Sequence, residues 1–390
     1  MITGLLIGLA LIVFVIWYFF IRSSKTPTVP GTGGELPVGS TLPGTSSEGP
    51  GGTLDSTASS GKTTVGISDH PVFDFWINQE TGEVFYLDPE GRVWGAKEGP
   101  DIELSQQTIA ALNAITPSPR GTGILASFGD PHSPQWGIFD VVDSAWSPLP
   151  ATFINVTWGA NQDTLFGFVR DGDTGAANLA RIDISAAQPT ITLLAEKILP
   201  LDVRLSFLYP SSLILAERPA ASYESRVWKF DTTRKTLNLL FSRSGFLIAT
   251  TQTPAYLLWS AGASEFIVSD AETSSSAVPV PFVTFPEKCA ATPEYLACFA
   301  PRTLSSLPPR IIPDDYLSGA FKTTDDLLLL DFSTLEIEAL QDSTLSDVSF
   351  DGWHPRIREQ DQALYFINRR DGKLYTTPLP AISEAPIPAE

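Results

Sequence analysis

The chain of 390 residues has few of the side chains that most often perform chemistry or bind metal ions. It contains two Cys, three His and one Met, and only 18% of its residues are charged. Two cysteines exclude a disulfide-dense mini-protein, and His70, His132 and His354 show no zinc-ligand spacing. A Gly-x-Ser-x-Gly elbow and a phosphate-binding glycine loop are also missing. We therefore expect no metal site and no cofactor, and the sequence favours a binding protein over an enzyme.

Basic residues are also scarce. Lys and Arg number 25 against 44 Asp and Glu, so the formal net charge is −19. This excess disfavours binding to a phosphate backbone, and we expect no nucleic-acid partner. Acidic and basic residues balance in residues 1–68, so the whole excess lies in residues 69–390. A domain this acidic should be soluble and should be repelled by an anionic lipid surface.

The first 21 residues contain no charged side chain. About 20 apolar residues are enough to span the ~30 Å hydrocarbon core of a membrane. Trp17 and Tyr18 near the end of this run, followed by Arg22 and Lys25, fit a membrane interface. The basic start and small-residue cleavage site of a secretory signal are absent. We predict a single-pass anchor in the cytoplasmic membrane over residues 1–21; a cleaved signal and a buried core helix are the alternatives.

Residues 22–68 have a different composition, because Gly, Ser, Thr and Pro make up most of the segment. Such a segment cannot bury enough apolar surface to offset the entropy of ordering it. As a flexible coil it would reach roughly 40 Å. We predict a disordered linker over 22–68, a folded domain over 69–380 and a Pro-rich tail over 381–390.

One pattern recurs through residues 69–390, namely an apolar β-rich run that ends in Asp before a polar turn. The six aspartates are Asp88, Asp140, Asp183, Asp231, Asp270 and Asp331, and residues 372–377 form a degenerate seventh copy. Two further strands precede each run, and no repeat has room for a crossover helix. Four-stranded antiparallel repeats of about 45 residues are typical of propeller blades. We predict an all-β fold, a β-propeller of seven four-stranded blades; a pair of β-sandwiches would not explain the repeated Asp.

Further details follow from this assignment. First strands should begin near residues 72, 112, 153, 202, 245, 288 and 347. The last copy offers only three strands, so we expect a strand near residues 63–67 to complete it and remove an open edge.

Each repeated Asp should accept backbone N–H groups in the turn that follows, rather than bind a metal. The alternating tryptophans should form inter-blade core rather than sugar-stacking platforms: Trp76, Trp94, Trp158, Trp228 and Trp259.

Three segments resemble a known group of proteins. They are Glu287–Ala290 with Tyr295–Cys298, Pro313–Gly319 continuing to Asp325-Asp326-Leu327, and Ala363–Asn368. They are similar to uncharacterised membrane-anchored β-propeller proteins with degenerate WD- or TolB-like repeats, as found in candidate-phyla bacteria. The resemblance covers the last third of the chain well and the rest only by repeat shape. It implies an anchored propeller and no particular activity.

The two cysteines, Cys289 and Cys298, are symmetric about Pro293-Glu294. A two-residue turn there would place them opposite each other in a hairpin, where Cβ atoms ~4–5 Å apart can form a disulfide. A bridge that uses every cysteine favours an oxidising compartment. Its short ring would contribute about 2–3 kcal/mol. Two buried free thiols are the alternative.

The connections between second and third predicted strands are the long ones: 129–135, 171–178, 218–225 and 301–324. In a propeller these loops share a face with the blade-to-blade connections, and insertions in repeat proteins concentrate on the binding face. We predict that a protein partner docks on this loop face, mainly on 301–324. The candidate binding residues are Arg310, Asp314, Asp315, Tyr316, His132, Asp171, Asp173 and Tyr223. In the alternative, the long loop folds back over its own blade and Tyr316 packs to cover an edge.

These observations lead to one functional interpretation. We predict a membrane-tethered, extracytoplasmic propeller that acts as a protein–protein interaction or envelope scaffold module. The alternative is a carbohydrate-binding or glycan-processing propeller that uses the channel or the loop face. The cysteine pair and the polar tether favour the extracytoplasmic side, whereas Arg22 and Lys25 after the span mildly favour a cytoplasmic domain.

Overall fold

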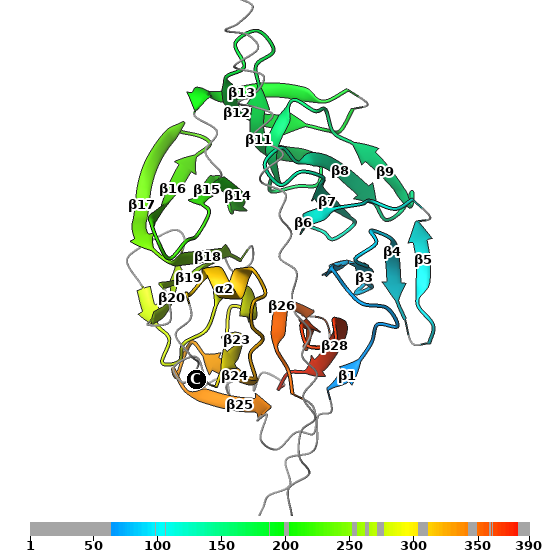
Figure 1. The fold of residues 1–390 in the computed structure, drawn as a ribbon, viewed down its shortest axis with the longest axis vertical. Helices are drawn as coiled ribbons and strands as arrows, with labels where there is room; N and C mark the ends of the chain where they lie inside the picture. The colour runs from blue at the N-terminus through cyan, green and yellow to red at the C-terminus, as the bar shows by residue number, and fades with distance from the viewer. Residues whose placement is uncertain are drawn as a thin grey trace, which may run out of the picture. The chain divides into compact units, whose positions relative to one another are not determined.

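The computed structural model describes residues 64–97, 99–105, 107–186, 188–198, 203–251, 256–261, 265–270, 277–302, 311–341, 349–358, 360 and 362–380. These residues form seven four-stranded antiparallel sheets, which are the blades of a ring (Figure 1). The predicted all-β, seven-bladed propeller is therefore confirmed. The predicted anchor, the linker up to residue 63 and the tail from residue 381 lie outside the described residues. Among the residues that are described, no helix is long and apolar enough to cross a membrane.

The first four blades follow one another along the chain. Blade 1 consists of β2 (Asp74–Ile77), β3 (Val84–Leu87), β4 (Val93–Ala96) and β5 (Ile102–Ser105). Blade 2 consists of β6 (Leu112–Pro117), β7 (Gly123–Phe128), β8 (Gln135–Asp140) and β9 (Ala145–Pro148). Blade 3 consists of β10 (Phe153–Trp158), β11 (Thr164–Arg170), β12 (Ala177–Asp183) and β13 (Thr190–Ile198). Blade 4 consists of β14 (Val203–Leu208), β15 (Ser212–Glu217), β16 (Glu224–Asp231) and β17 (Thr236–Ser244).

The last three blades include two short helices. Blade 5 consists of β18 (Phe246–Thr250), β19 (Tyr256–Ala261), β20 (Glu265–Asp270) and β21 (Ala277–Pro279). Blade 6 follows the 3₁₀ turn η1 (Pro286–Lys288) and consists of β22 (Cys289–Ala291), β23 (Tyr295–Pro301), β24 (Asp325–Asp331) and β25 (Ile337–Gln341), with the helix α2 (Asp314–Leu317) between β23 and β24. Blade 7 consists of β26 (Gly352–Arg358), β27 (Ala363–Asn368), β28 (Lys373–Pro378) and β1 (Val65–Gly66).

The ring is closed by β1, the earliest strand among the described residues. Val65 pairs with Thr376 and Gly66 with Tyr375, and the Ile67 N–H donates to Leu374 O at 2.9 Å. This confirms the expectation that a strand near 63–67 completes the last blade. It pairs an edge of β28 that would otherwise be open to other chains.

The repeated aspartates mark the turns as predicted, with one shift of register. Asp140, Asp183, Asp231 and Asp331 end third strands, and each accepts a hydrogen bond from the backbone N–H two residues later, at 2.7–3.0 Å. Asp88 instead follows the second strand of blade 1, and it accepts bonds from Arg92 N and Trp94 Nε1, both at 2.9 Å. The Asp270 side chain lies outside the described residues.

The apolar core lies between neighbouring blades. Phe166 of blade 3 stacks on Phe207 of blade 4, with centroids 5.6 Å apart, inside a buried cluster drawn from both blades. The other clusters likewise join neighbouring blades, so the packing that forms the apolar core also holds the ring of blades together. As predicted, four of the tryptophans are buried in the core: Trp76, Trp94, Trp158 and Trp259.

Candidate functional site

The long connection between β23 and β24 reaches beyond its own blade. Tyr316, in α2, is fully buried; it stacks on Phe285 at a centroid distance of 4.0 Å and meets the edge of Trp353 in blade 7. Leu247 from β18 belongs to the same cluster. The insertion of blade 6 therefore packs against blades 5 and 7, and Figure 1 shows α2 near β18 and β26. The expectation that Tyr316 contacts a partner is wrong, because this ring is an anchor in the core.

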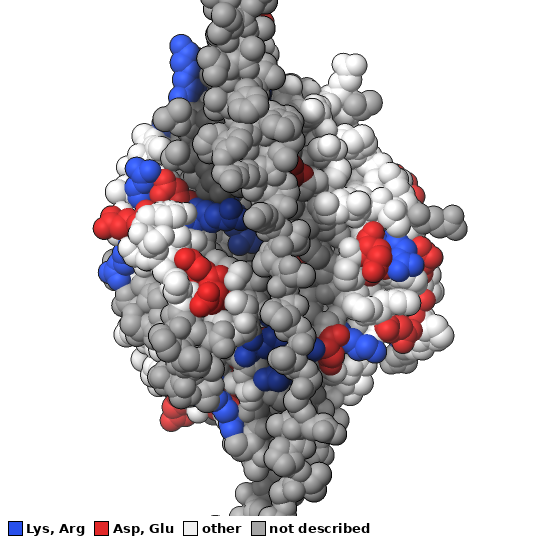
Figure 2. Space-filling model, in the orientation of Figure 1, with Lys and Arg blue, Asp and Glu red and all other residues white. Residues whose placement is uncertain are grey.

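The two predicted aspartates of the insertion hold it in place. Asp314 Oδ1 accepts a hydrogen bond from Ala221 N at 3.1 Å, which links α2 to the β15–β16 loop of blade 4. Asp315 Oδ2 accepts from Ile311 N at 2.9 Å. Both carboxylates are half-buried, and acidic side chains lie at the position of α2 in the space-filling view (Figure 2). Arg310 lies outside the described residues.

The remaining predicted binding residues lie in other loops of this face. His132 (β7–β8) and Asp173 (β11–β12) are exposed, and Asp171 Oδ1 accepts from Thr174 N at 2.8 Å, which lowers the pKa of Asp171. Blades 2 and 3 stand three positions from blade 6 around the ring, so these loops face the insertion from across it. Tyr223, in the β15–β16 loop, is 48% exposed and lies two residues from Ala221. The structure thus joins the loop that carries Tyr223 to the insertion, through Ala221, and leaves the other three residues apart.

Sequence reasoning missed two exposed apolar side chains of the insertion. Ile311 is 59% exposed and Leu317 is 41% exposed. Ile311 precedes α2 and Leu317 ends it, so both exposed side chains lie close in sequence to the buried anchor Tyr316. We call Ile311, Leu317 and Tyr223 the apolar patch. The helix was not predicted, because a four-residue helix has no periodicity to detect.

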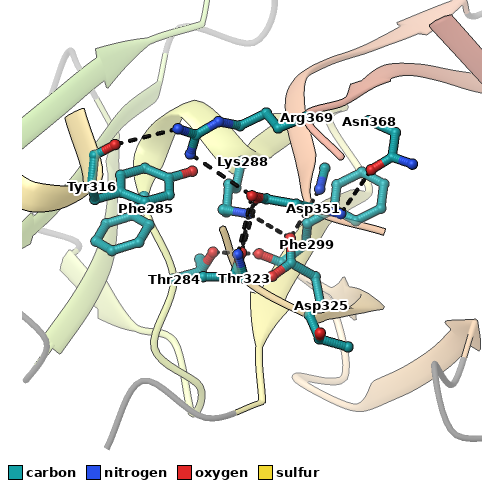
Figure 3. Close-up of polar contacts among 12 residues, drawn as sticks. Thr284, Phe285, Lys288, Phe299, Tyr316, Thr323, Asp325, Asp351, Asn368 and Arg369 are labelled. Carbon is teal, nitrogen blue, oxygen red and sulfur yellow. Dashed lines mark hydrogen bonds and ion pairs between the residues drawn. The ribbon is translucent and has the colours of Figure 1, made fainter. Parts of the chain in front are cut away.

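A buried charge network lies below the insertion (Figure 3). Lys288 is fully buried, and its Nζ donates to Asp351 Oδ1 at 2.6 Å, to Thr323 Oγ1 at 2.9 Å and to Asp325 Oδ2. Asp351 also accepts from Thr323, through the backbone N at 3.1 Å and the hydroxyl at 2.9 Å. The three segments that meet here are η1, the start of β24 and the residue before β26, so the network joins blades 6 and 7.

This network is not fully satisfied. Four buried side-chain atoms around it have no hydrogen-bond partner in the described part of the chain: Tyr316 Oη, Glu287 Oε2, Asp325 Oδ1 and Arg369 Nη1. Burial raises the pKa of Asp325, and the charge of Asp351 adds to this effect. Burial alone would also raise the pKa of Asp351, but Lys288 and Arg369 outweigh it and lower that pKa. The two carboxyl groups on one lysine are therefore driven toward different protonation states.

The sequence contained a weak signal for this network. Lys288 directly precedes a strand, and Asp325 is the first residue of β24, two positions before its apolar run, so each charge stands where the chain enters the core. No spacing rule connects them, because they are 37 residues apart. Within the described ranges, no three His, Cys, Asp or Glu side chains are grouped so as to hold a metal ion.

The two cysteines form the predicted disulfide. Cys289 and Cys298 are directly opposite in the β22–β23 hairpin and are joined by it.

An ionic contact lies where blades 7 and 1 meet. Asp74 Oδ2 lies 3.1 Å from His354 Nδ1, and Asp74 Oδ1 lies 3.3 Å from Arg356 Nη2. That ionic contact joins the inner strands on the two sides of the ring closure.

Comparison with known proteins shows the fold alone. No protein-family model matches the chain, and no curated protein matches it. Among solved structures, the Cps50 (Swd1) β-propeller domain of Myceliophteria thermophila matches with 10% identity and a TM-score of 0.50, over 82% of this chain and 100% of that one. A prolyl endopeptidase matches with 13% identity and a TM-score of 0.50, over 80% of this chain. This chain spans 50% of the endopeptidase. These likenesses support the β-propeller fold.

Proposed function

We propose that this propeller is a protein interaction module that binds its partner through the apolar patch on the loop face. The observation that carries the proposal is the anchored insertion of blade 6. Tyr316 fixes it from below, and Asp314 ties it to the β15–β16 loop at 3.1 Å. The side chains of Ile311 and Leu317 are then held outward in one arrangement. A short hairpin turn would be enough to connect β23 to β24, so the blade itself does not require this insertion.

Pre-organisation gives this surface an advantage in binding. A free loop would lose conformational entropy when a partner ordered it, whereas an anchored loop has already lost it. An exposed Tyr and large aliphatic side chains on two hydrogen-bonded loops supply the apolar centre that interfaces usually need. Single exposed apolar residues also occur on the opposite face, for example Val142 and Leu335 in tight turns, and such isolated residues need no explanation.

The charge of the domain indicates the kind of partner. The chain carries a net charge of −19, and its acidic excess lies in residues 69–390. Long-range attraction would therefore favour a protein with a basic rim around an apolar contact. The same charge argues against a flat approach to an anionic membrane.

We further infer, from the sequence, that residues 1–21 anchor the propeller and that it works in the cell envelope outside the cytoplasm. The disulfide between Cys289 and Cys298 supports an oxidising compartment. Maleimide labelling of native protein, denatured without reduction, tests this. Absence of labelling is expected, and full labelling of both cysteines would favour the cytoplasmic alternative.

Site-specific photo-crosslinking in the native envelope tests the binding face. A photoreactive residue replaces Leu317 in one variant and Val142 in another, because both are exposed but lie on opposite faces. We expect a defined cross-linked protein from position 317 and none from position 142. Equal cross-linking from both positions, or none from position 317, would contradict the proposal.

A further inference from the structure

Lys288, Asp325 and Asp351 have a geometry that goes beyond an ion pair. All three side chains have no exposed surface, and the Lys288 Nζ atom contacts one oxygen of each carboxyl group. Asp325 Oδ2 also accepts the Gly352 N–H at 2.9 Å, while its other oxygen, Oδ1, has no partner among the described residues. The two oxygens of Asp325 are therefore inequivalent: Oδ2 accepts hydrogen bonds from Lys288 and Gly352, whereas Oδ1 accepts none within the described residues.

Aromatic rings enclose these groups. Lys288 Nζ lies 5.5 Å from the centroid of Tyr316, which stacks on Phe285. A Cβ atom built on Gly352 would come within 2.2 Å of Phe299, so that ring lies directly against the donor of Asp325. A buried carboxylate in such surroundings loses much of its hydration free energy, and its neutral form becomes relatively more accessible. Figure 3 shows the three polar side chains converging between these rings.

We propose that Lys288 and Asp325 condense to form an intramolecular amide cross-link, with Asp351 as the group that transfers the proton. The amine nitrogen and the Asp325 carboxyl are already in contact, so the reaction needs no diffusion of the two partners. The product would retain the present contacts. Its carbonyl oxygen, the former Oδ2, still accepts the Gly352 N–H, and its amide N–H can donate to Asp351 Oδ1.

The reaction balances without any further reactant. Net transfer of one proton from the Lys288 ammonium to Oδ1 of Asp325, the oxygen that accepts no hydrogen bond in the described part of the chain, gives an amine and a neutral carboxylic acid, and burial favours that form of Asp325 by raising its pKa. The amine attacks the Asp325 carboxyl carbon, forming the C–N bond and placing a negative charge on Oδ2, where the Gly352 N–H stabilises it. Asp351, 2.6 Å from Nζ, takes a proton from nitrogen and delivers it to the hydroxyl at Oδ1. The C–O bond breaks, and one water molecule leaves.

Such a bond would fix the base of the insertion covalently. Lys288 precedes β22 and Asp325 begins β24, so the cross-link would close a ring that contains the disulfide-linked hairpin and the whole β23–β24 connection. The end of the insertion that enters β24 would then be held to η1 independently of the disulfide.

Mass spectrometry of the full-length chain tests the proposal directly. After reduction and denaturation, we expect an intact mass below that of the sequence by one water molecule. Proteolysis should yield a branched peptide that joins the segments containing Lys288 and Asp325. A mass equal to that of the sequence would overturn the proposal, and so would loss of water without a branched peptide, as cyclisation of an aspartate would give.

Three variants assign the roles. Lys288→Arg should have the uncrosslinked mass, whereas the matched control Lys322→Arg, an exposed lysine near the same strand, should keep the cross-link. Asp351→Asn retains both reacting groups and should lose the cross-link while circular dichroism still shows a folded β-protein. A folded Asp351→Asn variant that is fully cross-linked would contradict the role of Asp351. The mass of the unaltered protein decides the main claim even if a variant fails to fold.

Discussion

Asp314 and Ala221 are 93 residues apart in the chain, yet the carboxylate of Asp314 accepts the Ala221 N–H at 3.1 Å. Asp314 belongs to the insertion of blade 6 and Ala221 to a loop of blade 4, so the bond passes over blade 5. It shows that the long connection is a folded part of the ring surface. The predictions below concern this anchored surface and the ring that carries it.

Tyr316→Ala should destabilise the propeller by about 3–5 kcal/mol, because it removes a fully buried aromatic ring. The Tyr316 hydroxyl has no partner in the described part of the chain, so Tyr316→Phe should leave stability unchanged or raise it. Tyr223→Ala, an exposed tyrosine on the same face, is the control and should change stability by less than about 0.5 kcal/mol. Urea unfolding measures all three, and a neutral Tyr316→Ala would show that the insertion is not anchored.

Deletion of residues 64–67 should lower the free energy of unfolding by about 3 kcal/mol. The deletion removes the β1–β28 pairing and the packing of Ile67 against the blade 7–blade 1 cluster. It also exposes the edge of β28, so the truncated protein should aggregate more readily on heating. Thermal unfolding and light scattering test this, and an unchanged melting temperature would mean that β1 does not close the ring.

Gly352→Ala should cost about 1–3 kcal/mol through overpacking, because the new Cβ would lie 2.2–2.5 Å from ring atoms of Phe299. Gly172→Ala is the matched control, since nothing lies within 4 Å of a Cβ at that loop position. It should change stability by less than about 0.5 kcal/mol. Equal effects of the two substitutions would argue against the close contact of blades 6 and 7.

The Asp74 contact should make stability depend on pH. Burial alone would raise the pKa of Asp74, but the charges of His354 and Arg356 outweigh it and hold the pKa below its ordinary value. A carboxyl whose pKa is depressed by folding stabilises the protein above its unfolded pKa of about 3.9 and loses this contribution as pH falls further.

Asp74→Asn should therefore destabilise the protein by about 3 kcal/mol at pH 7, where a buried ion pair is broken. The difference from the unaltered protein should shrink below about pH 4. Urea unfolding between pH 3 and pH 7 measures it, with the exposed Asp143→Asn as control. A difference that is independent of pH would contradict the assignment.

Most of the fold could be predicted from the sequence because each blade repeats local information. The starts of six first strands were placed within two residues, and the turn role of Asp140, Asp183, Asp231 and Asp331 followed from hydrogen bonds within two residues of each. The first copy was out of register, since Asp88 also ends an apolar strand but makes its bonds to Arg92 and Trp94. A strand pattern alone does not say which strand of the blade it is.

The candidate site could be predicted only in part, because its contacts join distant segments. The sequence indicated that residues 301–324 matter, but it left two orientations of Tyr316 open, one toward a partner and one packed against the ring. Burial against Phe285, which comes from the blade 5–blade 6 connection, decides between them. The Lys288 network depends on three segments that no local pattern relates.

The central claim is that the anchored insertion binds a protein partner. The most direct measurement is quantitative partner capture by the double variant Ile311→Asp with Leu317→Asp, compared with Val142→Asp on the opposite face. These side chains are all exposed, so the melting temperatures should stay close to that of the unaltered protein. We predict that capture is lost in the double variant and retained in Val142→Asp. Full capture by a folded double variant would contradict the account.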